Sequence, residues 1–385
     1  MYYDELTSWR RIVWDNPLEQ FSGQDVERAL EAEVLTPIGL LALLSPAAEP
    51  YLESMAQKAR QLTVKHFGKA ITLFTPLYLA NFCSNQCVYC SFNSHNHIKR
   101  KKLSFTEVEQ EGLAIAFTGL QHLLLLTGES RVNSGPQYIK ACVKLLRPHF
   151  ASIGLEVYPL EEGEYRELVE AGVDSLTLFQ EVYDEDRYRE VHPAGPKSNY
   201  RFRLDAPERA CRAGIAEVTL GALLGLGDWR TETFFTALHG AYLLKNYPDV
   251  QISFSVPRMR PHTGSFEPEK PVTDSELVQI LLAYRLFLPT AGITISTRES
   301  PSLRDALLPL GITRMSAGSL TSVGGYADTL DTGSNQFEIA DERSVAEIVA
   351  MLYRNGYQPV FSDWVNMRKE AQASSGISAP AETKS

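Results

Sequence analysis

The sequence contains too few cysteines for a protein held together by disulfide bonds. It has only five in 385 residues, and an odd number leaves at least one unpaired. Secreted domains that depend on disulfides usually carry an even number of cysteines in a much shorter chain. We therefore expect a reducing compartment, where clustered cysteines more often bind metal or carry out redox chemistry.

Long apolar runs are also missing. No stretch reaches the roughly eighteen apolar residues that suggest a membrane-spanning helix. The first residues, MYYDELTSWRRIVWDNP, are acidic and aromatic, whereas a secretory signal peptide is first basic and then apolar. The sequence therefore predicts no membrane association and a cytoplasmic location.

Basic charge is in deficit too. The formal net charge is -10 and the isoelectric point is about 5.4. Proteins that cover nucleic acid need a cationic face for the phosphates, so we expect no nucleic-acid partner. A short basic run, HIKRKK at residues 97–102, stands out in this acidic chain. We expect this run to be solvated or to face a cofactor.

The first seventy residues are predicted to be helical. In SGQDVERALEAEV, Ser22 is placed as a helix cap and Asp25 as an acid in the first turn. In SPAAEPYLESMAQKARQLTVKHFG, a helix is expected to begin near a proline and to end at Gly68. We expect residues 1–70 to form a helical N-terminal extension that packs on the outside of the remaining chain.

Beyond residue 70, short apolar runs alternate with amphipathic stretches of helical length. The apolar runs are ITLFTPLYLA, HLLLLTG, IGLEVYPL, DSLTLFQE, EVTLGALLGL, QISFSVPRM, ITISTRES and ITRMSAGS. The helices expected between and after them are Thr106–Gly119, Gln137–Phe150, Glu161–Ala171, Pro207–Gly214, Thr231–Asn246, Asp274–Leu288 and Pro301–Leu310. Apolar runs of this length bounded by turn residues predict buried strands.

Eight such units in succession predict an α/β fold, a (β/α)8 TIM-type barrel over residues 71–319. This span is close to the roughly 250 residues typical of such barrels. An open, doubly wound sheet shows the same alternation, so the pattern alone leaves it as an alternative. Residues 320–368 are predicted to pack on the barrel. Residues 369–385, rich in Ser and Ala without periodicity, are predicted to be disordered.

Three of the five cysteines lie together in NFCSNQCVYCSFN, residues 81–93. Cys83, Cys87 and Cys90 follow the first predicted strand directly, and barrel active sites lie at that end of the strands. A structural zinc site normally has four protein ligands, often as two separate pairs. Cys142 and Cys211 fall in predicted helices and are expected to be small core residues rather than a fourth ligand.

Three thiolates can hold a four-iron cluster in which one iron keeps an open coordination position. Two other interpretations fit the same residues. One is a zinc site completed by His95 or His97, and the other is a redox pair formed by Cys87 and Cys90 alone. Tyr89, between the last two cysteines, is placed to pack beside a cofactor at the open iron.

The spacing CxxxCxxC, with an aromatic residue before the third cysteine, resembles the radical S-adenosylmethionine (SAM) enzymes. Within this superfamily the chain is similar to the 2-iminoacetate synthases, the tyrosine lyases of thiazole biosynthesis, from about Trp9 to Trp364. The motifs that carry this resemblance, in order, are PLYLANFCSNQCVYCSF, IKRKKLS, HLLLLTGES, FQEVYDEDRY, RAGI, GALLGL, SVPRMRP, STRESPSLRD and GGYAD. One departure is Ser91, in CSF where the family commonly has CGF, which adds only a small hydroxyl.

The resemblance implies that Cys83, Cys87 and Cys90 hold a 4Fe-4S cluster and that SAM binds its open iron. It implies a radical SAM lyase that breaks the Cα–Cβ bond of L-tyrosine. The products are 2-iminoacetate (dehydroglycine) for the thiazole of thiamine, p-cresol, 5'-deoxyadenosine and methionine. It also implies two protein partners, the thiazole synthase and an electron donor of the flavodoxin or ferredoxin type. The basic run is a candidate docking surface for that donor.

The resemblance also implies residues for SAM binding. Gly128 and Glu129, in LTGES, are candidates for the SAM amino group, and Glu156 and Arg203 for its ribose and carboxylate. For Gly128 and Glu129 the alternative is a turn glycine followed by an acidic helix cap. For the other two it is a surface charge beside a strand end.

Arg298, in STRES, and Ser316, in RMSAGS, are candidates for anchoring the tyrosine. A guanidinium can bind a carboxylate through two parallel hydrogen bonds, to which a hydroxyl adds a third. The alternative is a structural ion pair between Arg298 and either Glu299 or Asp305.

Three other functions are compatible with the sequence. The tyrosine lyase of hydrogenase cofactor assembly carries a further C-terminal cysteine cluster, whereas no cysteine follows Cys211 here. Tryptophan lyase would share the amino-acid anchor and hold a different ring. A barrel stabilised by zinc and acting as a binding module is the non-enzymatic alternative.

Overall fold

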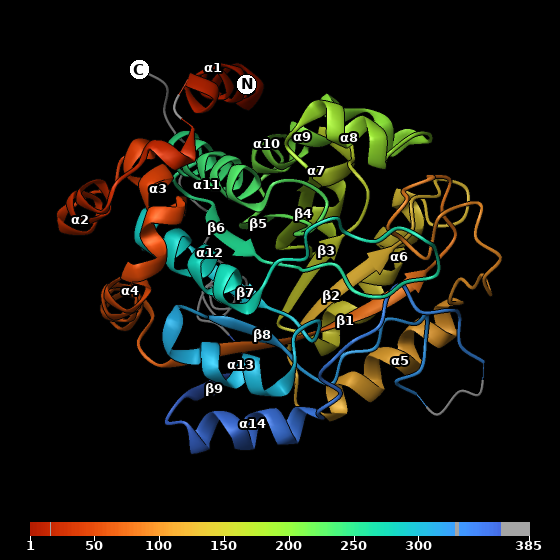
Figure 1. Ribbon diagram of the computed structural model, residues 1–385. Coiled ribbons are helices and arrows are strands. Elements are labelled where there is room, and N and C mark those ends of the chain that lie inside the picture. Colours follow the sequence, from red (N-terminus) through yellow and green to blue (C-terminus); the bar gives the residue numbers. More distant parts are fainter. Residues whose placement is uncertain (16, 328–330, 363–385) are drawn as a thin grey trace, which may run out of the picture.

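Eight parallel strands form a closed barrel ringed by helices (Figure 1). The computed structural model describes residues 1–15, 17–327 and 331–362. The strands are β1 (Ala70–Ala80), β2 (His122–Thr127), β3 (Ser152–Glu156), β4 (Ser175–Glu181), β5 (Glu217–Ala222), β6 (Gln251–Ser255), β7 (Gly292–Ile295), β8 (Arg314–Ser316) and β9 (Gln358–Val360). The sheet runs from β2 through β8 to β1, and β1 pairs with β2 to close it. The predicted barrel is confirmed, and the open-sheet alternative is excluded.

Helices fill the connections outside the barrel. The α-helices are α1 (Tyr2–Asp15), α2 (Gly23–Glu31), α3 (Pro37–Leu44), α4 (Leu52–Phe67), α5 (Phe105–Phe117), α6 (Pro136–Leu146), α7 (Glu162–Ala171), α8 (Glu185–Val191), α9 (Tyr200–Leu204), α10 (Ala206–Arg212), α11 (Trp229–Asn246), α12 (Asp274–Phe287), α13 (Pro301–Leu307) and α14 (Val345–Arg354). The 3-10 helices are η1 (Leu18–Gln20), η2 (Pro46–Tyr51), η3 (Arg147–His149), η4 (Pro196–Ser198) and η5 (Leu308–Leu310).

Local sequence signals explain where several of these helices begin and end. Ser104, Thr273 and Ser344 each open a helix with a capping box that a glutamate completes three residues later. Such a box satisfies backbone N–H groups that the first helical turn leaves without partners. Gly172, with φ of 117°, ends α7 in the left-handed conformation that glycine adopts without strain. Local sequence therefore sets where these helices begin or end.

Helices α1, α3 and α4 pack against α11 and α12 on the outside of the barrel, and α2 packs on α3 and α4 (Figure 1). The Tyr2 hydroxyl donates to the Phe235 carbonyl at 2.7 Å, and the Gln279 amide donates to the carbonyls of Leu43 and Ser45 at 2.9 and 3.0 Å. Gly68 ends α4 with a φ of 65°. The predicted helical N-terminal region is confirmed.

The chain departs from the sequence expectations at two places. Between β4 and α10 the sequence predicted only a helix at 207–214, but α8, η4 and α9 precede α10. Residues 358–360 add the strand β9, which pairs in parallel with residues 70–72 of β1. The predicted disordered tail, 369–385, lies outside the described residues. Within the described part of the chain, none of the helices could cross a membrane.

Candidate functional site

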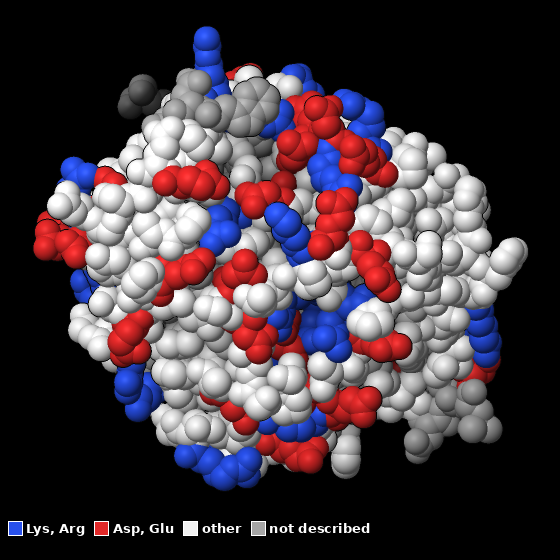
Figure 2. Space-filling view, viewed as in Figure 1, with Lys and Arg blue, Asp and Glu red and all other residues white. Residues whose placement is uncertain are grey.

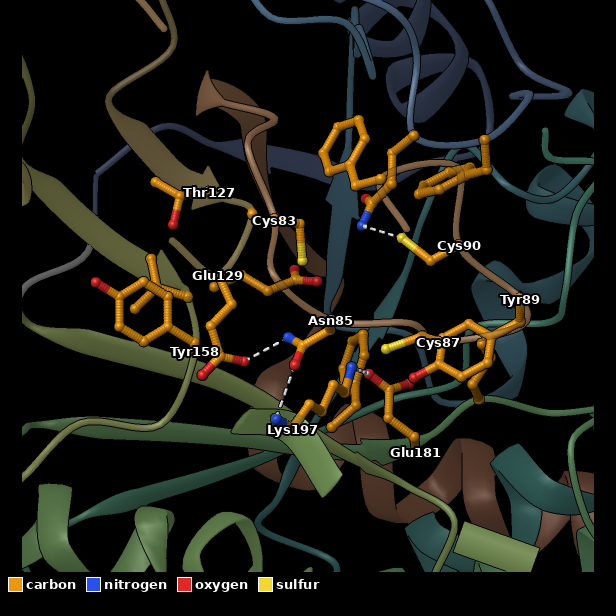
Figure 3. Close-up of a pocket in the computed structure, with 18 of the residues that line it drawn as sticks. Cys83, Asn85, Cys87, Tyr89, Cys90, Thr127, Glu129, Tyr158, Glu181 and Lys197 are labelled. Carbon is orange, nitrogen blue, oxygen red and sulfur yellow. Dashed lines mark hydrogen bonds and ion pairs between the residues drawn. The ribbon is translucent and has the colours of Figure 1, made fainter. Parts of the chain in front are cut away.

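The three clustered cysteines lie on one cavity at the carboxyl ends of the barrel strands. Cys83, Cys87 and Cys90 all come from the loop at 81–104, between β1 and α5. Figure 3 shows their sulfur atoms facing the same space. The three cysteines therefore lie at the carboxyl-terminal end of the barrel, as the sequence predicted.

Arg100 holds the backbone of this cysteine loop in place. Its guanidinium donates to the backbone carbonyls of Asn81 at 2.6 Å, Phe92 at 2.8 Å and Asn93 at 2.6 Å. The neighbouring Lys101 is buried and pairs with Glu107 at 2.9 Å. The exposed His97, Lys99 and Lys102 agree with the expectation of a solvated run, but Arg100 and Lys101 do not. These two side chains hold the loop and the start of α5 instead.

The segment at 191–199, which follows α8, supports the cysteine loop from the side. The backbone N–H of Gln86 donates to the Ala194 carbonyl at 3.0 Å, and that of Val88 to the Val191 carbonyl at 3.2 Å. The backbone N–H of Lys197 donates to the Asn85 side chain at 2.8 Å. Sequence reasoning missed this support, because the contacts depend mostly on backbone groups and join residues about one hundred positions apart.

Tyr89 is held by a buried histidine. Its hydroxyl lies 2.6 Å from Nε2 of His192, whose Nδ1 lies 2.8 Å from the Tyr188 carbonyl. A carbonyl only accepts, so Nδ1 carries the proton and Nε2 accepts from Tyr89. Burial, together with the charge of Lys197, lowers the pKa of His192 to about 2, which keeps the imidazole neutral. The ring of Tyr89 is thereby fixed at the cavity wall.

Within the segment at 191–199, Gly195 lies directly against the cysteine loop. It has a φ of 97°, and a Cβ there would lie 2.5 Å from Asn85 Oδ1 and 2.7 Å from Asn85 Cα. We expect Gly195→Ala to displace the cysteine loop and to lower the iron content of the reconstituted protein severalfold. Gly214→Ala is the matched control, because Gly214 has a φ of 90° but open space around it.

Both variants carry the strain of a left-handed alanine, about 1 kcal/mol. Iron analysis and thermal unfolding of the two proteins side by side measure the difference. Equal iron content in both would show that contact with Asn85 does not matter for the loop.

The cysteine loop fits an iron-sulfur cluster better than a zinc ion. Among the described residues, no three His, Cys, Asp or Glu side chains converge closely enough to hold one metal ion. His95 and His97 are exposed and do not line the cavity. Burial raises the pKa of the Cys87 thiol to about 12, so this group ionises only beside a strong positive charge such as iron. Three thiols spread around one space suit the corners of a cluster.

All the residues proposed for SAM binding line this cavity: Tyr89, Gly128, Glu129, Glu156 and Arg203. Glu129 accepts a hydrogen bond from the Asn85 amide at 2.6 Å (Figure 3). A Cβ at Gly128 would lie 2.4 Å from the Phe82 carbonyl oxygen, so only glycine fits there. The alternative of a simple turn glycine does not account for this close approach to the cysteine loop.

A buried ion-pair cluster that sequence reasoning missed lies in the same cavity. Glu181 binds Lys197 Nζ at 2.6 Å and Arg203 at 3.4 Å. A bulge at the end of β4 turns Glu181 inward, and its φ of 71° is the one positive value for a non-glycine residue in the described chain. Arg203 is also buried, which excludes the alternative of a surface charge.

A second cavity continues from the first into the barrel. Glu156, Arg298 and Phe337 line both cavities, and Ser316 lines the second. Burial raises the pKa of Glu156 to about 7, although Arg298 opposes the shift. The two cavities thus meet where a half-buried arginine and a half-buried glutamate are near each other.

Arg298 makes no structural ion pair among the described residues. It donates to the Arg258 carbonyl at 3.2 Å, and its guanidinium lies 3.5 Å from the centre of the Phe337 ring. Glu299 pairs with Arg258, and Asp305 pairs with Arg343. The structural alternative suggested for Arg298 is therefore excluded. The N–H groups of its guanidinium are therefore available to an anionic ligand.

Residues 331–341 form a strap along the two cavities, in which Gln336 lines the first cavity and Phe337 lines both. Backbone N–H groups of the strap donate to the carbonyls of Lys99, Pro261 and Thr297, at 3.1, 3.0 and 2.8 Å respectively. Gln336 accepts from the Tyr78 hydroxyl at 2.7 Å, and its amide lies 3.8 Å from the sulfur of Cys90. The strap therefore joins the cysteine loop to the loops after β6 and β7.

On the face shown in Figure 2, acidic and basic side chains are interspersed. No continuous basic surface appears there among the described residues. This face therefore offers no surface of the kind that binds nucleic-acid phosphates.

Comparison with known proteins extends these observations. The Radical SAM superfamily model matches residues 77–234, and the model of the biotin and thiamin synthesis associated domain matches residues 255–358. The 2-iminoacetate synthase of Escherichia coli K12 is 43% identical over 360 residues, covering 92% of this chain and 95% of that protein. The 2-iminoacetate synthase of Salmonella typhimurium LT2 is 42% identical over the same coverage.

Solved structures show the same fold. The FeFe-hydrogenase maturase HydG from Carboxydothermus hydrogenoformans has a TM-score of 0.85 and 34% identity, covering 95% of this chain and 85% of that chain. Methylornithine synthase (PylB) has a TM-score of 0.72, and its 22% identity supports the fold alone.

Proposed function

The chain belongs to the 2-iminoacetate synthase family of the radical SAM superfamily, and from this premise we propose that it cleaves L-tyrosine between Cα and Cβ. It is a radical SAM lyase whose cofactors are a 4Fe-4S cluster and SAM. The products are 2-iminoacetate, which supplies the thiazole of thiamine, and p-cresol. SAM is consumed to 5'-deoxyadenosine and methionine.

The observation that carries this proposal is the junction of the two cavities. Three thiols line the first cavity, and Arg298, which has no ion pair with any described residue, lies where the first cavity meets the second. A radical formed in the first cavity would meet an amino acid anchored at that junction. When bound, the cluster and SAM supply an electron and a carbon-centred radical that takes a hydrogen atom from the substrate.

Within this proposal the protein holds and orients the reactants. Cys83, Cys87 and Cys90 would hold the cluster. The residues that would contact SAM line the same cavity: Tyr89, Gly128, Glu129, Glu156 and Arg203. Arg298 would bind the carboxylate of tyrosine through two hydrogen bonds, and Ser316 would add a third. The Ser316 hydroxyl already accepts from the Thr297 N–H at 3.1 Å, which orients it in the second cavity.

The strap and the buried charges serve the same purpose. Gln336 lines the first cavity and Phe337 lines both, so these side chains would help to shield the substrate from water. Glu181, Lys197 and Arg203 would set the charge around the cofactor, with little of their side chains exposed to solvent. Water exclusion protects a radical from side reactions.

Two protein partners and a cytoplasmic location complete the proposal. The unstable imine product favours direct transfer to the thiazole synthase that uses it. An electron donor of the flavodoxin or ferredoxin type would reduce the cluster. We do not assign the docking of this donor to the basic run, because Arg100 and Lys101 are engaged inside the protein.

We expect the anaerobically reconstituted protein to contain about four irons per chain and to convert L-tyrosine to p-cresol when SAM and a reductant are present. Product analysis by chromatography measures p-cresol and 5'-deoxyadenosine. L-tryptophan in place of tyrosine tests the related lyase activity. Consumption of tryptophan without p-cresol from tyrosine would contradict the proposed substrate. A single tightly bound zinc would contradict the enzyme class.

A further inference from the structure

The second cavity is unusual for the inside of a barrel because hydroxyl groups line it. Barrel interiors are normally packed with branched apolar side chains. Here Thr177 and Thr219 are in register on β4 and β5, and Ser255 and Thr294 on β6 and β7. All four line the cavity. Small side chains at these positions leave the space that larger residues would fill.

None of these four hydroxyls has a hydrogen-bond partner within the described chain. Three of the four belong to buried residues, Thr219, Ser255 and Thr294, which are 3%, 8% and 6% exposed, whereas Thr177 is half-buried. The Ser319 hydroxyl, in the same cavity, is also buried without a partner. Buried hydroxyls are usually satisfied, since an unmade hydrogen bond costs free energy. Such a group of unsatisfied hydroxyls therefore points to a polar ligand atom.

Part of the remaining wall is apolar, beside further polar residues such as Ser152 and Ser175, and the floor of the cavity is closed. Phe74, Leu124 and Phe179 line the sides. Below, Arg314 and Glu217 form a double hydrogen bond at 2.8 Å, and Arg314 separates this cavity from the opposite end of the barrel. The site therefore suits a flat apolar group that carries one polar atom at its far end.

The distance from the carboxylate anchor fits this arrangement. Arg298 follows Thr294 by four residues, which is no more than about 14 Å of chain. An amino acid held at Arg298 and pointing into the barrel would place the end of its ring near Thr294 and its neighbours. A phenol meets both requirements, because its ring is apolar and its hydroxyl both donates and accepts.

We propose that Thr219, Ser255 and Thr294 form the subsite that binds the phenolic hydroxyl of the substrate and selects tyrosine over phenylalanine. This inference rests on the proposed function and adds the origin of its specificity. Phenylalanine would leave the same hydroxyls buried and unpaired. Sites built to bind a substrate hydroxyl reject the analogue that lacks it for this reason.

Substitutions that remove the hydroxyls and keep the volume test the subsite. The variants are Thr219→Val, Ser255→Ala, Thr294→Val and the triple combination. Equilibrium dialysis of labelled L-tyrosine and L-phenylalanine, with cluster and SAM but without reductant, measures binding in the absence of turnover. We expect each single variant to weaken tyrosine binding about fivefold and to leave phenylalanine binding unchanged. The triple variant is expected to bind the two amino acids equally.

Thr63→Val is the matched control, since Thr63 is buried on α4 and its hydroxyl bonds only to the Ala59 carbonyl. It should not change either affinity. Equal weakening of tyrosine and phenylalanine in the subsite variants would overturn the proposal, as would no weakening at all. If the triple variant does not fold, the single variants decide the question. Failure of the wild-type protein to convert tyrosine would instead overturn the proposed function.

Discussion

Replacing Cys87 with serine is expected to abolish cluster assembly and SAM cleavage. Cys87 is the most buried of the three cysteines that line the cavity, at 5% exposure. Serine keeps the size of the side chain but does not supply a thiolate, so one corner of the cluster loses its ligand. We expect 5'-deoxyadenosine formation to fall by more than about a hundredfold, because the loss of even outer partners of a metal site costs that much. Iron analysis and visible absorbance measure the cluster directly.

Cys142→Ser provides the control for this substitution. Cys142 is fully buried on α6, away from the cavity. Its replacement buries a hydroxyl and should cost about 1–3 kcal/mol of unfolding free energy, with the iron content unchanged. Equal loss of iron in both variants would mean that the effect at Cys87 reflects general destabilisation and not ligation.

Replacing Arg298 with alanine is expected to raise the KM for tyrosine about a hundredfold, which corresponds to the loss of a hydrogen-bonded charge pair worth up to about 3 kcal/mol. The lysine variant keeps the charge but cannot form the two parallel hydrogen bonds of a guanidinium. It should therefore recover only part of the affinity. Steady-state rates at varied tyrosine, together with iron content, measure both effects.

Arg230→Ala is a control for loss of a half-buried arginine. Like Arg298, Arg230 donates to a backbone carbonyl and covers an aromatic ring, here those of Leu44 and Trp229. It lies on the outer helices and should leave KM unchanged. If Arg298→Ala also removed the cluster, the assigned role in substrate anchoring would be wrong.

The barrel could be predicted because its strands have a strong local signal. Strands of a parallel barrel are buried on both faces, so they appear as continuous apolar runs such as HLLLL before Thr127. The capping boxes at Ser104 and Thr273 mark helix starts in the same local way. In contrast, β9 has three residues, one of them Pro359, and carries no signal of this kind. Its pairing with β1 depends on the finished barrel.

The site was only partly predictable for a related reason. The spacing of Cys83, Cys87 and Cys90 is local, so their common cavity followed from the sequence. The partners of charged groups are set by tertiary structure instead. Nothing in the sequence distinguishes Arg258, which pairs with Glu299, from Arg298, which does not. Likewise, α8 is short and polar, so the support that the segment at 191–199 gives to the cysteine loop became visible only in the fold.

The strap at 331–341 has a consequence for how the protein is made. Gln336 is synthesised about 250 residues after Cys90, which at roughly 5–20 residues per second is an interval on the order of ten to fifty seconds. During that time the thiols of the nascent chain exist before the segment that brings Gln336 beside Cys90. Cluster delivery can therefore precede the binding of the strap to the loops around the cavity. In the folded chain, by contrast, Gln336 and Phe337 already line the space that the cluster enters.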